Sequence, residues 1–213
     1  MKKRILVPLF FILIPILIGF AYAWFEDDEF LNVIIRPGSI EVSIQVYFDD
    51  VEVLSNSPYY DSTTKILQIN TFDDQAPNYI GKLKITMQVV AHNTSRLRFR
   101  LLDEWVLTRY FTNGESTNII VPYDVVVQGI NQSPYTIHPD FFRVSANPYY
   151  YFDGFIGKNQ TLQFTLVNGG LPYPVRTTDN YYEEVFVHLQ VIVDVVQANR
   201  IVEKWNVEAT IFD

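Results

Sequence analysis

Hydrophobic and polar residues alternate with a period of two along much of the chain beyond residue 36. This alternation is typical of β strands that have one buried and one solvated face. It is clearest in 40–48, 83–89, 97–101 and 162–166, where the apolar positions are Ile40, Val42, Ile44, Val46, Phe48, Leu83, Ile85, Met87, Val89, Leu97, Phe99, Leu101, Leu162, Phe164 and Leu166. The residues between the apolar positions of the third segment are Arg96, Arg98 and Arg100, which the pattern places on the solvated face.

Residues 185–196 differ because both faces are largely apolar, with only His188, Gln190 and Asp194 interrupting them. This pattern predicts a central strand that is covered on both sides.

Turn-forming residues separate these segments. Examples are Pro37-Gly38, Asn113-Gly114 and Asn168-Gly169-Gly170. Nine or ten short strands spaced in this way, with a helical pattern only at 197–205, predict an all-β fold, namely an antiparallel β-sandwich. No linker divides residues 37–213, so we expect one sandwich domain, with long loops at 53–63 and 168–182.

The first 23 residues predict export. Lys2, Lys3 and Arg4 precede an uncharged stretch that ends in Ala21-Tyr22-Ala23, a small-x-small cleavage signal. Cleavage by signal peptidase after Ala23 would leave Trp24 as the new N-terminus and place the protein outside the cell. The alternative is an uncleaved anchor, because an uncharged stretch of this length approaches the roughly 20 residues that span a bilayer.

Composition narrows the function classes. The chain of 213 residues has 16 basic and 24 acidic side chains, a net charge of -8, and removal of residues 1–23 would make it more acidic still. An acidic protein without basic clusters beyond the first residues repels phosphate backbones, which argues against a nucleic-acid partner. Since there are no cysteines, thiol catalysis and Cys-ligated metal sites are excluded.

The sequence offers little for catalysis. His92, His138 and His188 are scattered singly, whereas a zinc site needs at least three convergent ligands. Adjacent acids such as Asp103-Glu104 lack the spacing of a calcium loop and are expected in solvated turns. We therefore expect neither an enzyme nor a metal or other cofactor.

Two further features are open to more than one interpretation. Asn93, Asn131 and Asn159 begin Asn-x-Ser/Thr sequons and are candidate glycosylation sites, although about 1.5 such triplets are expected by chance. Tyrosines cluster at 59–60, 149–151 and 181–182. Their amphipathic rings would either contact a glycan or protein partner or cover the ends of the sandwich.

Several short motifs resemble the TasA/camelysin family of secreted biofilm-matrix fibre proteins, which includes archaeal bundling-pilus relatives. The similar segments are the cleavage junction at 20–27, the Gly-centred turn and strand start at 35–42, the aromatic strand at 150–152 followed by 157–161, and the closing strand at 191–199 with Trp205 downstream. The chain departs from the family pattern in its dense acidic run at 26–29 and its long 168–182 loop. Some family members carry a metallopeptidase label, but this chain has no matching ligand motif.

The resemblance implies a jelly-roll subunit that is exported, trimmed and assembled head to tail with copies of itself. The product would be extracellular filaments of a biofilm matrix or a pilus-like bundle, with other matrix or cell-surface proteins as further candidate partners.

The residues independently suggest how subunits would join. Residues 24–36 hold Trp24, Phe25, four acids and the apolar run Phe30, Leu31, Asn32, Val33, Ile34 and Ile35, joined to the sandwich by the Pro37-Gly38 turn. Such a segment can add a strand to an open sheet edge of a neighbour, with Leu31, Val33 and Ile35 in one row and Phe30 and Ile34 in the other. Because the two surfaces differ, the contact does not close and generates a filament. Two alternatives are an ordinary edge strand of the same subunit, and a membrane-anchored sandwich that binds a glycan or protein.

Overall fold

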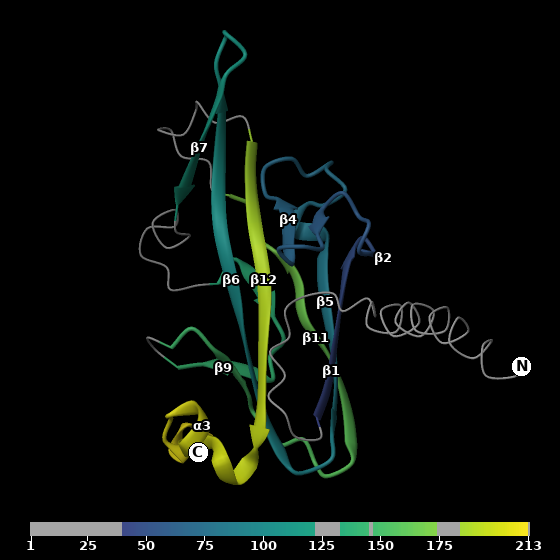
Figure 1. The fold of residues 1–213 in the computed structure, drawn as a ribbon, viewed down its shortest axis with the longest axis vertical. Helices are drawn as coiled ribbons and strands as arrows, with labels where there is room; N and C mark the ends of the chain where they lie inside the picture. The colour runs from purple at the N-terminus through teal and green to yellow at the C-terminus, as the bar shows by residue number, and fades with distance from the viewer. Residues whose placement is uncertain (1–39, 122–132, 145–146, 174–183, 213) are drawn as a thin grey trace, which may run out of the picture.

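The computed structural model describes residues 40–121, 133–144, 147–173 and 184–212. Within them the chain forms two antiparallel sheets packed face to face, which confirms the predicted all-β sandwich (Figure 1). The described strands are more numerous than expected because several have only two or three residues. They are β1 (Ile40–Phe48), β2 (Val51–Glu52), β3 (Tyr60–Asp61), β4 (Ile66–Asn70), β5 (Leu83–Ala91), β6 (Ser95–Tyr110), β7 (Ser116–Val121), β8 (Tyr135–Ile137), β9 (Phe141–Arg143), β10 (Tyr150–Phe152), β11 (Gln160–Gly170) and β12 (Glu184–Gln197).

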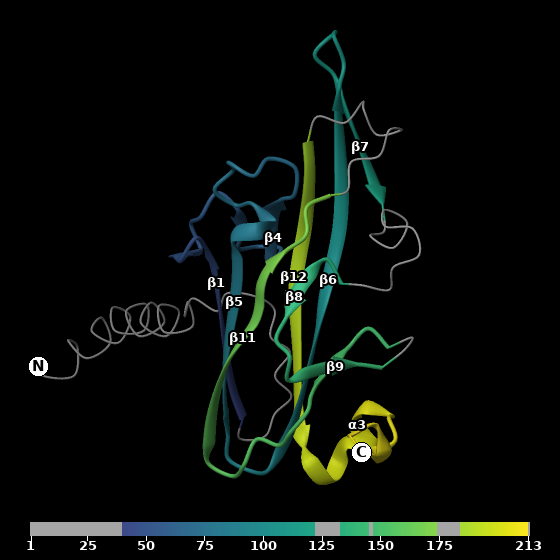
Figure 2. The same ribbon diagram turned by 180° about the vertical axis from the view of Figure 1, so that it is seen from behind.

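The first sheet has the order β2-β1-β5-β11-β8, and the second has the order β3-β4-β12-β6-β10-β9, with β7 also paired to β6. Figure 2 shows the first sheet from behind, with β1, β5 and β11 running side by side. The predicted central strand at 185–196 is confirmed as β12, which lies between β4 and β6. Its inward side chains from Val185 to Val193 are buried, whereas Phe186, His188, Gln190 and Ile192 on its outer face are only half-buried.

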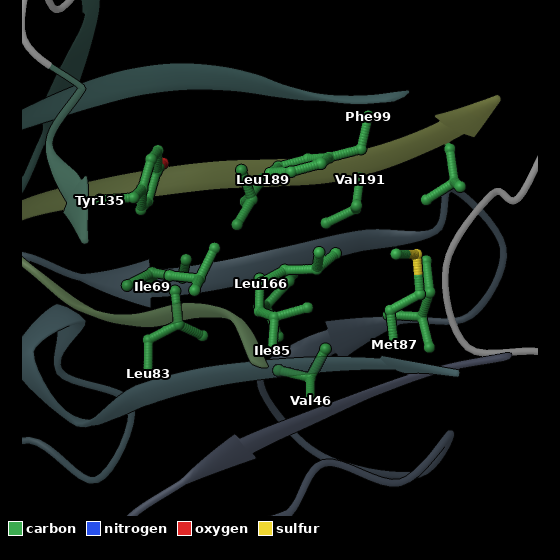
Figure 3. Packing of buried hydrophobic residues seen from close by; sticks show 14 of the residues in the cluster. Val46, Ile69, Leu83, Ile85, Met87, Phe99, Tyr135, Leu166, Leu189 and Val191 are labelled. Carbon is green, nitrogen blue, oxygen red and sulfur yellow. The ribbon is translucent and has the colours of Figure 1, made fainter. Parts of the chain in front are cut away.

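Alternating apolar side chains from both sheets form the core. Met87 and Ile85 of β5 and Leu166 of β11 face Leu189 and Val191 of β12 across the sandwich (Figure 3). All of them are almost completely inaccessible to solvent. Burial of apolar surface between the two sheets is therefore the main source of stability in a chain that has no disulfide.

The C-terminal segment covers part of the outer face of the second sheet. The predicted helix at 197–205 is present as the 3-10 turn η2 (Ala198–Arg200) and the helix α3 (Ile201–Trp205), followed by η3 (Ala209–Phe212). Ile201 and Trp205 pack with Tyr151 into a second, smaller apolar cluster. This cover corrects the expectation for the arginines of β6, since Arg96 and Arg98 are each only 8% exposed.

The longest hairpin extends past the rest of the sandwich. Strand β6 continues to Tyr110 and turns at Asn113-Gly114 into β7, and the hairpin tip lies at the end of the molecule opposite α3 (Figure 1). Gly114 has a φ of +84°, a conformation that favours glycine, as the Asn-Gly turn signal predicts. We call this hairpin the β6–β7 arm.

Candidate strand-acceptor edge

Strand β12 has a sheet edge that is only half paired within the described part of the chain. On the side away from β6, strand β4 pairs with residues 186–189 of β12, from Phe186↔Asn70 to Leu189↔Leu67. Beyond this point β12 continues to Gln197, paired with β6 along its whole length. Residues 191–197 therefore have no neighbouring strand on the β4 side among the residues that the structure describes.

The direction of the backbone groups along this edge follows from one hydrogen bond. The Thr71 N–H donates to the Val185 carbonyl at 3.0 Å, so Val185 directs its polar backbone groups to the β4 side. Backbone groups alternate in direction along a strand. Val191, Val193, Val195 and Gln197 therefore direct their N–H and C=O groups to the open edge, while their side chains share the inward row.

Strand β1 has a corresponding edge in the other sheet. Strand β2 pairs only with Tyr47 and Phe48, which leaves residues 40–45 without a described neighbour on that side. The Val53 N–H donates to the Val46 carbonyl at 2.8 Å, so Ile40, Val42 and Ile44 direct their backbone groups outward.

The two open edges lie on the same side and at the same end of the sandwich. The rings of Phe48 and Tyr59 pack edge to face, with their centroids 6.1 Å apart. This packing places the β1 side of one sheet over the β3–β4 side of the other. Ile40 pairs with Ala91 at the end of β5, and Gln197 pairs with Ser95 at the start of β6, only four residues later. Together the two edges, 40–45 and 191–197, form what we call the acceptor edge.

The acceptor edge has an apolar inner face. Val191 and Val193 of β12 and Ile44 of β1 are buried, and Val42 packs against the same core. A strand added beside 191–197 must therefore direct every second side chain into apolar surroundings. The outer row of β12 is different, because Asp194 there pairs with Arg98.

The predicted donor and cleavage residues cannot be placed beside this edge. Ala21, Ala23, Trp24, Phe25, Phe30, Leu31, Val33, Ile34 and Ile35 all lie outside the described residues, as does Asn131. No helix in the described part is long and apolar enough to cross a membrane. Sequence reasoning predicted a central β12 but missed its open edge, because the pattern does not reveal that β4 ends opposite Leu189.

The other two sequons lie at the acceptor end. Asn93 is exposed in the turn between β5 and β6, and Asn159 is exposed in the loop before β11, with a φ of 57°. The bridge between Ser95 and Ile156 holds these two segments together. Glycans on either residue would therefore lie near the acceptor edge.

The tyrosines at 149–151 pack rather than point into solvent. Tyr151 is completely buried in the cluster around Trp205. Tyr150 stacks on Phe99, with the two ring centroids 5.1 Å apart. The Tyr149 ring lies 3.9 Å from the Arg98 guanidinium. These three residues fit the interpretation that tyrosines cover the sandwich, whereas 181–182 lie outside the described residues.

Acidic and histidine side chains form no metal-ligand cluster within the described ranges. Asp103 and Glu104, which we expected in a turn, lie in the middle of β6. Asp103 accepts hydrogen bonds from Trp105 Nε1 at 3.0 Å and from the Tyr135 hydroxyl at 3.4 Å. The Asp103 side chain is exposed to solvent, but partial desolvation by its neighbours raises the pKa of its carboxyl, and the Trp105 hydrogen bond opposes this shift.

Searches of protein families, of curated proteins and of solved structures find no match to this chain.

Proposed function

We propose that the protein is a secreted structural subunit that polymerises head to tail into extracellular filaments. In this proposal, residues 24–35 of one copy add a strand to the acceptor edge of the next. The observation that carries it is the half-paired β12, in which every second residue from Val191 to Gln197 directs its backbone groups to a side where no described strand lies.

The lengths and patterns of the two partners agree. The apolar run 30–35 has six residues, and the open part of β12 has seven. Side chains alternate along an added strand, so Leu31, Val33 and Ile35 can all face the apolar inner row that contains Val191 and Val193. Main-chain hydrogen bonds would supply affinity, and the apolar row would fix the register.

Processing would control assembly. While residues 1–23 hold Trp24 at the membrane, the segment cannot leave its own subunit, whereas cleavage after Ala23 releases it. Residues 36–39 also allow the segment to fold back, since four residues reach at most about 13 Å and packed sheets lie about 10 Å apart. The same edge could then be filled within one subunit, which would give a closed monomer.

A pair of substitutions in the donor segment tests the proposal. Val33→Asp places a charge in the row that faces the core, whereas Asn32→Asp places the same charge in the opposite row. We expect filaments of the secreted protein, viewed by electron microscopy, to disappear only with Val33→Asp. Filaments from both variants, or a wild-type protein that stays monomeric after cleavage, would contradict strand donation.

The resemblance to the TasA/camelysin family supports this proposal and names the setting, a biofilm matrix or a pilus-like bundle. A membrane-anchored binding module is the second candidate, and retention of residues 1–23 in the purified protein would favour it.

A further inference from the structure

The β6–β7 arm presents a second sheet edge, far from the acceptor edge. Strand β7 pairs with β6 from Trp105↔Val121 to Tyr110↔Ser116, and no strand of the described residues lies on its other side. Unpaired edges of this kind are templates for strand addition, and proteins usually protect them with charges, prolines or bulges.

Strand β7 has none of these protections. Residues 116–121, with the sequence Ser-Thr-Asn-Ile-Ile-Val, contain no charge and no proline. Their register with β6 shows no bulge. Ile119 and Ile120 are 43% and 62% exposed, although they lie on opposite faces of the strand. An uncharged, regular edge with exposed isoleucines is suited to pairing with another strand.

The outward backbone groups of β7 can be identified. The Phe111 N–H donates to the Glu115 carbonyl at 2.8 Å, and this pair continues the register of Tyr110 with Ser116. Because bonded and non-bonded pairs alternate in an antiparallel ladder, Thr117 and Ile119 direct their backbone groups to β6. Ser116, Asn118 and Ile120 therefore direct theirs to the free edge.

We propose that β7 pairs antiparallel with β7 of a second copy of this chain, centred on Ile119. In this register, Asn118 of each copy exchanges hydrogen bonds with Ile120 of the other, so the outward groups of both residues are satisfied. Ile119 lies opposite its own equivalent in a non-hydrogen-bonded pair, where side chains approach most closely. The two-fold axis makes the contact self-complementary and closed.

Electrostatics and shape both favour a second copy at this edge. The chain has a net charge of -8, so most surfaces of two copies repel each other, whereas residues 116–121 are uncharged. The arm lies at one end of the molecule (Figure 1). A two-fold axis through Ile119 places the two sandwiches on opposite sides of the axis along the strand direction.

This contact does not depend on strand donation. Combined with head-to-tail assembly, it would join subunits of two neighbouring filaments side by side, since a closed contact cannot extend a filament by itself.

Single cysteines test the pairing, because the chain has no cysteine of its own. Ile119→Cys would bring two thiols together across a non-hydrogen-bonded pair, whose spacing of about 4.5 Å between Cα atoms permits a disulfide. Val202→Cys, in α3 at the other end of the molecule, is the control because Val202 is 60% exposed. Under mild oxidation of the full secreted protein, we expect Ile119→Cys to form covalent dimers at least about ten times faster than the control.

A second variant tests whether the contact uses the outward backbone groups of β7. Asn118→Pro removes an N–H that points away from β6, so the β6–β7 ladder should persist, and proline is tolerated at such edge positions. Added to Ile119→Cys, it should reduce the dimerisation rate to that of the Val202→Cys control, with an unchanged circular dichroism spectrum. If the spectrum changes, Asn118→Lys is used in place of Asn118→Pro and should reduce the dimerisation rate in the same way.

Equal rates for Ile119→Cys and Val202→Cys would overturn the proposal, as would dimerisation that persists with the edge variant. The same measurement in the Val33→Asp background separates the two contacts. Cross-linking there should persist even though filaments are lost, so failure of one proposal is distinguishable from failure of the other.

Discussion

Arg98 on β6 and Asp194 on β12 form a buried ion pair at directly opposed positions of the two longest strands. Nε and Nη2 of Arg98 donate to the same Asp194 oxygen, Oδ2, at 3.2 and 2.8 Å. The guanidinium also lies against the rings of Tyr149 and Trp205, with its carbon 3.9 and 4.5 Å from the two ring centroids. The pair thus joins the sheet to the C-terminal segment that covers it.

Removal of one partner should destabilise the fold. Asp194→Ala leaves the Arg98 charge buried without its carboxylate, which typically costs about 3–5 kcal/mol. We expect a decrease of about this size in the free energy of unfolding, measured by urea denaturation. Glu203→Gln is the control because it removes a carboxylate from the exposed Arg200 pair, and it should leave the denaturation midpoint nearly unchanged. Equal effects of the two substitutions would contradict a structural role for the buried pair.

The core of the acceptor end can be tested at Val193, which is 1% exposed. Val193→Asp would place an unpaired charge between the two sheets, so we expect it to prevent folding. The matched substitution Val202→Asp, at an exposed position of α3, should fold normally. Soluble yield and the far-ultraviolet circular dichroism spectrum distinguish the two results. A soluble, folded Val193→Asp variant would contradict the assignment of β12 as the core strand.

Asp103 should make stability depend on pH. Partial desolvation raises the pKa of its carboxyl above the unfolded value, although the side chain is exposed to solvent. Its contribution is therefore most favourable below the unfolded pKa of about 3.9 and is lost as the pH rises through the folded pKa. At neutral pH the charged carboxylate is the less favourable form.

Asp103→Asn removes this charge while it keeps an oxygen that can accept the hydrogen bond from Trp105. Because solvent screens this exposed carboxylate, we expect only a slightly higher thermal midpoint than wild type at pH 7 and a smaller difference at pH 3, measured by calorimetry. A gain of the same size at both pH values would show that the carboxyl titrates as in the unfolded chain.

Export should leave Trp24 as the first residue. The small-x-small signal Ala21-Tyr22-Ala23 motivates this expectation. Intact mass and N-terminal sequencing of extracellular protein should show that residues 1–23 are absent. Ala23→Arg or Ala23→Lys should block cleavage and retain the protein at the membrane. The conservative Ala23→Ser should still be cleaved. Extracellular material that still carries residues 1–23 would favour the anchored alternative.

The sequence predicted the sandwich because each main strand carries its own alternating pattern. Ile44, Val46 and Phe48 of β1, for example, are buried as their spacing requires. Local patterns could not reveal which side chains are covered by segments that lie far away in the sequence. Arg98 appears solvated beside its neighbours in sequence, yet Trp205, more than one hundred residues later, covers it.

The candidate sites were only partly predictable for a related reason. An unpaired edge depends on where a neighbouring strand starts or ends, and the pairing of β4 with β12 stops at Leu189 because β4 starts only at Ile66, after the β3–β4 turn in which Lys65 has a φ of 59°. No residue of β12 itself indicates where its pairing with β4 stops. The candidate donor segment, in contrast, was proposed from its own residues, since an apolar run behind an acidic one is visible without the fold.

Deletion of residues 24–35 gives the strictest test of strand donation, because it separates a donated strand from an integral one. A segment that fills only a neighbour's edge contributes nothing to the core of its own subunit. The shortened protein should therefore remain soluble and folded but form no filaments.

The open acceptor edge of the shortened protein should then bind the missing segment as a free peptide. A ligand that binds only the folded state raises stability by about 2.7 kcal/mol at one hundred times its dissociation constant. We expect the peptide 24–35 to raise the thermal midpoint, and the Val33→Asp peptide to have no effect because its charge would face Val191 and Val193. A shortened protein that unfolds would instead indicate a strand of its own subunit, and one that still forms filaments would show that assembly uses another surface.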